Sequence, residues 1–481
     1  MKKKLLVTLL AASFALTMLA GCGNSESAEG QARGETGSEA QDKTEEADRS
    51  ENGSTQSGAE DGAGSSQADG SEGGGGSGEN GSESDADEKT SGGQDKDADQ
   101  DSAAEGEAGY VIPEVVMPSL EIPDSEAFAF VRDMKIGWNL GNTFDAYSDR
   151  TFADELEAEA QWVGVATTRE MIDDIREAGF HSIRIPVSWH DHVDENYQIS
   201  DVWLNRVQEV VDYAYDSGMY VILNIHHDNS EQFMYPSTEY LEQSVSYVTA
   251  IWQQLAERFA DYDQHMIFEG MNEPRQVGTA WEWWIDPASE DCKDAIACIN
   301  TINQAFVDTV RATGGNNKNR YLMVPGYDAS PDGVLNEGFV FPTDAEGVTD
   351  KLILSVHAYT PYKFALQGPG ESGSTAEFKA SALGSTRDVT YFMDRLYNTF
   401  IQNGIPIVID EFGARDKGQN TQARVDYATY YIAAARARGM TCFWWDNNVF
   451  EGDGEIFGIY HRQDRSFPYP EIVEGLMKYA E

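Results

Sequence analysis

Residues 181–227 read HSIRIPVSWHDHVDENYQISDVWLNRVQEVVDYAYDSGMYVILNIHH, and this stretch contains one complete strand–helix–strand unit. The apolar runs at 181–187 and 219–226 are typical of buried strands, and the helix-period segment 203–216 between them ends just before a glycine. Two strands joined through a helix in this way predict a neighbouring parallel pair.

The same alternation repeats along the C-terminal part of the chain. Further strands are predicted at 134–140, 266–271, 321–325, 352–358, 406–409 and 440–445. Further helices are predicted at 168–178, 239–259, 298–312, 388–402 and 422–438, whereas 326–351 is expected to be loop. Eight strands with intervening helices predict an α/β fold of the (β/α)8 TIM-barrel type. An open doubly wound sheet is the alternative, but GWNLGN (137–142) lacks the third glycine and the following helix of a nucleotide-binding loop.

Composition divides the chain of 481 residues into three parts. Residues 23–109 contain 24 acids, 5 bases and no Val, Ile, Leu, Met, Phe, Trp, Tyr or Pro. Such a tract cannot bury enough apolar surface to offset its backbone entropy, so it is predicted to be a disordered, extended linker. Residues 110–481 are predicted to form one large domain with a substantial core. The net charge of -49 makes nucleic acid a poor partner.

The first 22 residues have the pattern of a bacterial export signal. Three lysines precede an apolar run at 5–20, which is too short for a convincing membrane span. The run ends in LAGC (19–22), which resembles the lipobox at which bacterial lipoproteins are cleaved and lipidated, here on Cys22. An ordinary cleaved signal with an incidental cysteine is the alternative. We therefore expect an extracytoplasmic protein, anchored in the membrane through Cys22 and monomeric.

Three further cysteines lie in the C-terminal part. Cys292 and Cys298 are six residues apart and could form a local disulfide in an exported domain, whereas Cys442 sits in an apolar run and is expected to be a buried free thiol. No arrangement of Cys and His suggests a structural zinc site, and no cofactor is expected.

Polar side chains gather where the predicted strands end, which is where a barrel of this type builds its reaction site. Two carboxylates stand out, Glu273 after the fourth strand and Glu411 after the seventh. Two carboxyl groups about 5 Å apart can divide acid and nucleophile roles in glycoside cleavage with retention, whereas a gap of about 6.5–9.5 Å admits water and inverts stereochemistry. The sequence leaves this distance open.

The strand ends together resemble glycoside hydrolase family 5 of clan A, the cellulase family, over about residues 125–480. The segments that carry the resemblance are GWNLGN (137–142), IRIPV (183–187), NIHH (224–227), MNEP (271–274), HAY (357–359), IDEFG (409–413) and FWWDN (443–447). The residues of these segments are most similar to those of bacterial endo-β-1,4-glucanases, a subfamily that also includes xyloglucanases and mixed-linkage glucanases. The resemblance implies a β-glucan substrate.

The resemblance also implies roles for single residues. Glu273 would be the general acid/base and Glu411 the nucleophile of a retaining double displacement. Arg184 and Tyr359 would hold the Glu411 carboxylate, and Asn272 would bind the sugar 2-hydroxyl. A cation and a hydroxyl donor beside a carboxylate both favour its ionised form.

Further residues would contact sugar by the same resemblance. His227 and His357 match two active-site histidines, one ordering hydroxyls of the reacting sugar and one near the acid/base. His226 and Asn142 would contact neighbouring subsites, and Trp445 would form the platform under the sugar at the cleavage point, with its neighbour Trp444 in the core.

Three alternatives stay open. A metal site at HHD (226–228) is disfavoured, because adjacent strand residues point to opposite faces. A retaining mannanase or xylanase would use the same machinery, and a tethered polysaccharide-binding protein would keep the sugar contacts without turnover. Loop aromatics that could line a polymer cleft are Trp189, His190, Tyr235, Trp281, Trp283, Trp284, Tyr362 and Phe364.

Overall fold

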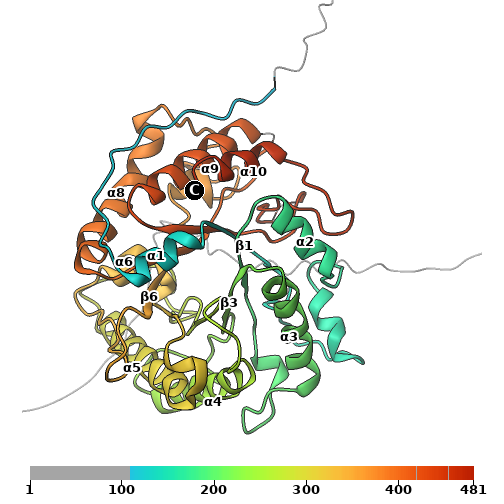
Figure 1. Ribbon diagram of the computed structural model, residues 1–481, viewed down its shortest axis with the longest axis vertical. Helices are drawn as coiled ribbons and strands as arrows, with labels where there is room; N and C mark the ends of the chain where they lie inside the picture. The colour runs from blue at the N-terminus through green and yellow to red at the C-terminus, as the bar shows by residue number, and fades with distance from the viewer. Residues whose placement is uncertain (1–108, 419, 453) are drawn as a thin grey trace, which may run out of the picture. The chain divides into compact units, whose positions relative to one another are not determined.

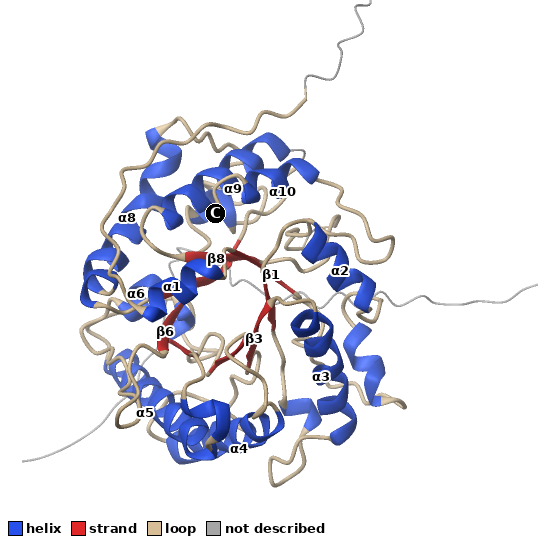
Figure 2. Cartoon of the chain, viewed as in Figure 1, coloured by secondary structure: helices blue, strands red, loops and turns tan. Residues whose placement is uncertain are grey.

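The computed structural model describes residues 109–418, 420–452 and 454–481. Within them, eight parallel strands pair in sequence order and close into a barrel, with helices around it (Figures 1 and 2). The strands are β1 Ile136–Asn139, β2 Ser182–Ile185, β3 Tyr220–Asn224, β4 Met266–Glu269, β5 Leu322–Pro325, β6 Leu352–His357, β7 Ile407–Phe412 and β8 Thr441–Trp444. The predicted barrel and its eight strands are therefore confirmed.

All six predicted helices are also present, and a short additional helix, Pro331–Val334, lies within 326–351, which was expected to be loop. The α-helices are α1 Glu126–Asp133, α2 Arg169–Glu177, α3 Asp201–Asp216, α4 Leu241–Arg258, α5 Glu290–Thr313, α6 Pro331–Val334, α7 Tyr362–Ala365, α8 Leu383–Thr399, α9 Thr421–Arg436 and α10 Pro470–Met477. Short 3-10 turns are η1 Glu155–Ala160, η2 His190–His192, η3 Gly315–Lys318, η4 Tyr327–Ala329 and η5 Ile401–Asn403. The sequence did not indicate α1 or α10, and α5 begins eight residues earlier than expected, because Ser289 caps it by accepting a hydrogen bond from the Cys292 N–H.

Helix α1 closes the amino end of the barrel, in front of the strands in Figure 1. Its Phe130 ring stacks on Tyr321 with centroids 3.6 Å apart and meets Tyr220 edge-on at 5.2 Å. Ala127 and Val131 of α1 are fully buried in the same cluster. Burying an aromatic or branched side chain contributes roughly 1.5–3 kcal/mol. The helix therefore seals one end of the barrel and leaves the carboxyl ends of the strands as the open face.

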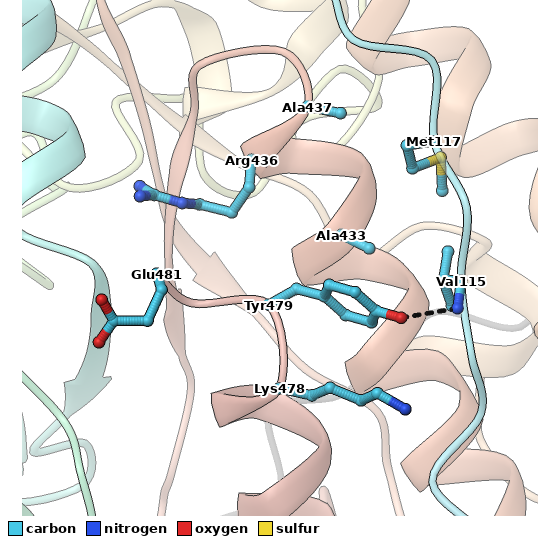
Figure 3. A pocket seen from close by; sticks show the side chains of 8 residues that line it. All are labelled: Val115, Met117, Ala433, Arg436, Ala437, Lys478, Tyr479 and Glu481. Carbon is cyan, nitrogen blue, oxygen red and sulfur yellow. Dashed lines mark hydrogen bonds between the residues drawn. The ribbon is translucent and has the colours of Figure 1, made fainter.

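The segment before α1 runs along the outside of the barrel over α9 and α10. Figure 3 shows the Val115 N–H donating to the Tyr479 hydroxyl, at 2.8 Å. At one end of this segment Val111 exchanges two hydrogen bonds with Gln422. At the other end Ile122 packs on Gly439, where a Cβ would lie 2.9 Å from the Ile122 Cδ1. Residues 110–124 are thus part of the folded domain.

The inside of the barrel changes from apolar to polar along its axis. The layer nearer the amino ends of the strands is apolar and contains Ile222, Ile267, Met323, Ile353, Val408 and Phe443. Two residues further along, toward the carboxyl ends of the strands, the inward positions are polar and fully buried. They are Asn139, Arg184, Asn224, Glu269, Ser355 and Asp410. Buried polar groups persist only when they are hydrogen-bonded. This second layer therefore forms the floor of a site at the carboxyl ends of the strands.

Several predictions concern residues outside this description. The predicted export signal at 1–22, with Cys22, and the acidic linker at 23–109 lie outside the described residues except for Gly109. Among the described residues, no helix is long and apolar enough to cross a bilayer.

The proposed local disulfide is wrong, because Cys292 and Cys298 are both free and buried. Both lie on α5, where six residues span about 9 Å along the axis, beyond the reach of a disulfide. Cys442 is also a buried free thiol, as predicted.

Candidate active site

Arg184 of β2 is the anchor of the site. Its guanidinium is fully buried and binds Glu269 through two hydrogen bonds, from Nε at 2.6 Å and from Nη2 at 2.9 Å. It also donates to Glu411 Oε1 at 2.6 Å, Asn272 Oδ1 at 2.6 Å and Asn139 Oδ1 at 3.0 Å. A planar, permanently charged donor can hold several acceptors at fixed angles. One cation therefore sets the positions of groups from β1, β4 and β7.

Glu411 enters the site because β7 is irregular. The β6–β7 ladder pairs Val356 with Ile409 and then His357 with Glu411, so Asp410 is skipped. An extra residue of this kind lets two successive side chains share one face of a strand. Asp410 accordingly accepts hydrogen bonds from the Ser355 hydroxyl at 2.8 and 3.0 Å, while Glu411 also reaches the mouth of the barrel.

The Glu411 carboxylate has a donor on each oxygen. Arg184 donates to Oε1 at 2.6 Å, and the Tyr359 hydroxyl donates to Oε2 at 2.8 Å. Burial favours the neutral acid and raises the pKa of Glu411, whereas the charges of His357 and Arg184 favour the carboxylate. Burial also raises the pKa of Tyr359 well above its usual value, so its hydroxyl stays protonated and keeps donating. The sequence-based pairing of Arg184 and Tyr359 with Glu411 matches these contacts.

Glu273 shares a proton with His357. The Nδ1 atom of His357 lies 2.7 Å from Glu273 Oε1 and 3.6 Å from Glu411 Oε2. Burial opposes ionisation of Glu273, but its hydrogen bond to His357 and the charges of His357 and Arg275 outweigh burial and lower its pKa to about 2. Burial opposes the charge on His357 too, yet Glu411 and Asp410 raise its pKa well above the usual value. The proton therefore resides on His357, one hydrogen bond away from Glu273.

The two carboxylates lie close to each other. One oxygen of Glu273, one oxygen of Glu411 and one nitrogen of His357 all lie within 4.8 Å of one another. This spacing leaves no room for a water between the carboxylates and a sugar carbon, and it matches the short separation of about 5 Å typical of retaining glycosidases. The distance that the sequence left open is thus decided by the fold.

Two neutral histidines line the site beyond these carboxylates. His226 follows β3, and its Nδ1 lies 3.1 Å from Asn224 Nδ2. Burial lowers the pKa of His226 well below its usual value, and burial together with the charge of Arg275 lowers the pKa of His227 to about 4. An uncharged imidazole has one donor and one acceptor, which suits it to sugar hydroxyls.

Trp445 points into the site, whereas Trp444 belongs to the core. The Trp444 ring is fully buried, packs edge-on against Phe412 at 5.4 Å and donates from Nε1 to the Phe457 carbonyl. The Trp445 ring is 8% exposed and lies parallel to His226, with centroids 5.8 Å apart. A Cβ on Gly141 would come within 2.9 Å of the Trp445 ring, so only glycine fits there. The division of roles predicted from strand alternation is confirmed.

Asn142 lies at the rim of the site, in the loop after β1. It is half-buried with a φ of 58°, and its N–H donates to Asp145 Oδ2 at 2.9 Å. Asp145 is fully buried and approaches His226 and His227 within 4.8 Å. Both Asp145 oxygens accept backbone N–H groups, from Asn142 and Thr143. Asp145 therefore organises this loop.

The metal reading of residues 226–228 fails at Asp228, although the His226 and His227 rings lie next to each other, with centroids 4.4 Å apart, and do not point to opposite faces as expected. Asp228 accepts hydrogen bonds from the Trp189 N–H at 3.0 Å, from the His190 ring at 2.7 Å and from the Tyr247 hydroxyl at 3.1 Å. Its carboxylate is thus committed to the loop after β2 and does not join His226 and His227.

Sequence reasoning missed several residues of the site. Glu269, Asp410, Asn139 and Ser355 form its buried floor. A signal for Glu269 was available, because a charged residue inside the apolar strand MIFE (266–269) needs a partner. The loop aromatics were partly misread: Trp189, Tyr235 and Phe364 are buried, while Trp283, Trp284 and Tyr362 are exposed. Tyr147 and Trp162, which are 38% and 41% exposed and lie next to His227, were not anticipated.

Comparison with known proteins agrees with this geometry. Residues 144–451 match the model of the family described as cellulase, glycosyl hydrolase family 5. The chain belongs to glycoside hydrolase family 5. Endoglucanase 1 of Ruminococcus albus is 41% identical over 354 residues, which are 73% of this chain and 80% of that protein. The cellulase/esterase CelE of Acetivibrio thermocellus is 40% identical over 76% of this chain, and the match spans 42% of its length.

A solved structure of the same family is more similar still. A family 5 lichenase from a Caldicellulosiruptor species is 55% identical, with a TM-score of 0.77, and the match covers 78% of this chain and all of that one. As a member of family 5 with endoglucanase relatives, the protein is a glycoside hydrolase. Glu411 on β7 and Glu273, which follows β4, both lie within the matched residues.

Proposed function

We propose that this protein is a retaining endo-β-1,4-glucanase in which Glu411 is the nucleophile and Glu273 is the general acid/base. The observation that carries the proposal is the approach of the two carboxylates, with an oxygen of each within 4.8 Å of the other. Retaining enzymes need this short separation, since the nucleophile attacks the anomeric carbon directly, whereas inverting enzymes leave room for a water between the carboxylate and that carbon.

In the first step Glu411 attacks the anomeric carbon while Glu273 protonates the glycosidic oxygen. The proton that lies in the 2.7 Å contact between Glu273 and His357 moves to Glu273 and then to the leaving sugar, so the alcohol leaves neutral. Arg184 and Tyr359 keep Glu411 aligned through their hydrogen bonds. The product of this step is a covalent ester between Glu411 and the sugar.

In the second step Glu273 acts as the base. With the leaving chain gone, its carboxylate takes a proton from water, and the water oxygen attacks the anomeric carbon and displaces Glu411. Asn272 accepts from Arg184 through Oδ1 at 2.6 Å, so its amide N–H₂ is free to donate to the sugar 2-hydroxyl. That hydrogen bond strengthens as positive charge develops on the sugar ring.

The substrate is a β-glucan chain. The Trp445 ring supplies an aromatic face for the C–H surface of the sugar at the cleavage point, and neutral His226 and His227 supply hydroxyl contacts. The 55% identity to a lichenase supports mixed-linkage β-glucan as the preferred polymer, with cellulose-type and xyloglucan chains as further substrates.

The test is reducing-sugar release from a panel of barley β-glucan, carboxymethylcellulose, xyloglucan, glucomannan and xylan. We expect release from barley β-glucan to be fastest, and to fall by about 10²- to 10⁴-fold in Glu273→Ala, the contribution expected of a general acid. Faster release from glucomannan or xylan would show that the enzyme is a mannanase or a xylanase and not a β-glucanase. A folded protein that binds a glucan without cleaving it would identify a tethered binding protein.

We further propose that the enzyme is held at the outer side of the cytoplasmic membrane by lipid on Cys22, as a monomer. The pattern LAGC at 19–22 after an apolar run supports this proposal. Cells expressing the full chain should incorporate an alkyne fatty acid into the protein, and Cys22→Ala should abolish the label and release the enzyme from membranes. The control is Cys292→Ala, which removes a buried cysteine and should leave the label unchanged. Equal labelling of Cys22→Ala would exclude the anchor.

A further inference from the structure

Arg275 follows Glu273 by two residues and contacts it from the side opposite His357. It is 7% exposed, its Nη1 donates to the Glu273 carbonyl at 3.2 Å, and the same nitrogen lies 3.5 Å from Glu273 Oε2. His357 binds the other carboxylate oxygen, Oε1. Glu273 is therefore held between two cations, one on each oxygen.

The other side of Arg275 is covered by an aromatic ring. Its guanidinium carbon lies 3.9 Å from the centre of the Trp283 ring, and its Nε lies 3.6 Å from Glu282 Oε1. A cation that is stacked and partly desolvated in this way contributes about 1–2 kcal/mol. One face of Trp283 is thus occupied by Arg275, while the ring as a whole remains 45% exposed.

The loop that carries Trp283 is tied to its neighbours. The Tyr327 hydroxyl donates to the Trp281 carbonyl at 2.6 Å, the Tyr235 hydroxyl donates to the Val277 carbonyl at 3.1 Å, and Glu282 Oε2 accepts from the Gly278 N–H at 2.9 Å. These hydrogen bonds join the loop to the segments that follow β3 and β5. The tryptophan therefore belongs to a fixed wall of the cleft.

The proposed reaction indicates which part of the substrate lies on the Glu273 side of the cleavage point. On the proposed function, Glu273 delivers its proton to the oxygen of the departing sugar, so the departing chain lies on the Glu273 side of the cleavage point. The free face of Trp283 is an exposed aromatic surface, and Arg275 contacts both this ring and Glu273. Such surfaces suit the C–H faces of pyranose rings.

We infer that Arg275 is a positioning residue for the acid/base Glu273, and that it couples Glu273 to a binding site for the leaving β-glucan chain on the free face of Trp283. A sugar that packs on the free face of Trp283 contacts the same ring whose other face covers Arg275. The position of Arg275 in turn sets the orientation of Glu273 through Oε2. Binding of the leaving chain and alignment of the acid are thereby linked.

Other charged groups around Glu273 define the expected pH behaviour. They are His357 on β6, Glu411 on β7, His227 after β3, Asp328 after β5 and Glu282 in the same loop. Arg275 is the cation at Oε2. A cation favours the carboxylate, so its removal makes the Glu273–His357 pair hold its shared proton to higher pH. The alkaline limb of the kcat/KM profile should therefore shift upward when the charge is removed.

The experiment compares two substrates. Barley β-glucan needs protonation of a sugar alcohol and has a leaving chain, whereas 2,4-dinitrophenyl β-cellobioside has a leaving group that needs little protonation and has no leaving sugar. In the full-length enzyme, Arg275→Met keeps an apolar stem under Trp283 but loses the charge. We expect kcat/KM on β-glucan, which reports the first step, to fall about 10- to 100-fold, kcat/KM on the aryl cellobioside to change less than about threefold, and the alkaline limb to move upward. Arg275→Lys should recover part of the loss.

A second variant tests the sugar surface without touching the charge. Trp283→Ala should raise KM for β-glucan by about five- to tenfold, the loss of one aromatic contact of about 1 kcal/mol, and leave the aryl cellobioside unaffected. The matched control is Tyr391→Ala, which removes an aromatic ring that is 63% exposed on α8 and should alter neither substrate. Equal losses on both substrates in Arg275→Met, with an unmoved alkaline limb, would mean a merely structural role and overturn the inference.

The same assays separate this inference from the proposed function. Glu273→Ala must itself show the contrast between β-glucan and the aryl cellobioside in kcat/KM. If Glu273→Ala lowers kcat/KM equally for both substrates, the acid/base assignment fails. If Glu273→Ala shows the contrast and both Arg275→Met and Trp283→Ala behave like the parent, the assignment stands and the Arg275 coupling is wrong.

Discussion

Replacing Glu411 with glutamine is expected to lower kcat on barley β-glucan by on the order of 10⁴-fold or more, because an amide cannot attack the anomeric carbon. Glutamine has the same shape: its single side-chain oxygen can still accept from Arg184, and its amide N–H₂ can donate to the Tyr359 hydroxyl oxygen, at the positions where these residues contact Glu411 at 2.6 and 2.8 Å. The melting temperature should therefore change little. The measurement is steady-state hydrolysis of β-glucan together with thermal unfolding of the same preparation.

Azide assigns the two carboxylates independently. In Glu411→Ala, azide enters the space left by the nucleophile and attacks a dinitrophenyl cellobioside once, which gives the α-glycosyl azide. In Glu273→Ala, azide attacks the covalent sugar–Glu411 ester, and the second inversion gives the β-glycosyl azide. The opposite pair of products would exchange the two roles. Normal turnover in Glu411→Gln would exclude Glu411 as the nucleophile.

Replacing Arg184 with methionine is expected to lower the free energy of unfolding by about 3–5 kcal/mol and to reduce kcat by at least about 10²-fold. The reason is that Glu269, Asp410 and Glu411 would be left in the barrel without the guanidinium that they face at 2.6, 3.6 and 2.6 Å. Breaking a buried ion pair leaves uncompensated charge in a medium that solvates it poorly. Denaturant unfolding at neutral pH measures the loss.

The pH dependence of that loss has a definite sign. In Arg184→Met the buried carboxylates have raised pKa values in the folded state, so they contribute stability that is present below their unfolded pKa and is lost as pH rises. The deficit relative to the parent should therefore be smaller near pH 5 than near pH 8. Arg465→Met is the matched control, because its ion pair with Asp174 lies on the surface and should cost less than about 1 kcal/mol. A deficit that grows toward low pH would contradict this account.

Both predictions rest on an unequal distribution of charge in the site. Arg184 and His357 are the cations on the barrel strands, and they face the carboxylates of Glu269, Asp410, Glu411 and Glu273. An excess of acids in a buried site keeps a proton bound on His357 beside Glu273. In the proposed mechanism that proton is the one that acid catalysis consumes, so the charge balance would be part of the mechanism.

Much of this site could be predicted because barrel strands end at one face. The polar residues after each apolar run, Arg184, Glu273, His357 and Glu411, meet there because parallel strands carry their carboxyl ends to the same rim. The side-chain period of two likewise separated Trp445 from Trp444. The meeting of strand ends and the alternation of side chains follow from local pattern and strand direction, and both can be inferred from the sequence.

Other features depended on contacts between residues far apart in the chain. Glu269 was missed because its partner Arg184 is 85 residues away. The possible Cys292–Cys298 bridge was wrong because α5 starts at Glu290 and holds both cysteines on one rigid helix. The stacking of Trp283 on Arg275 needed the geometry of a loop whose path no periodicity describes.

The sequence by itself predicted the barrel and singled out the two carboxylates, because apolar periodicity and the polar residues at strand ends are local information, and the motifs at those ends carried the resemblance to the family. Only the tertiary structure decided their separation and surroundings. The irregular pairing of β7 places both Asp410 and Glu411 on the inner face. The pattern of residue types does not predict where the pairing of two strands will shift by one residue. The distance between groups on β4 and β7 is set by how eight strands close into a ring, which is a property of the whole domain.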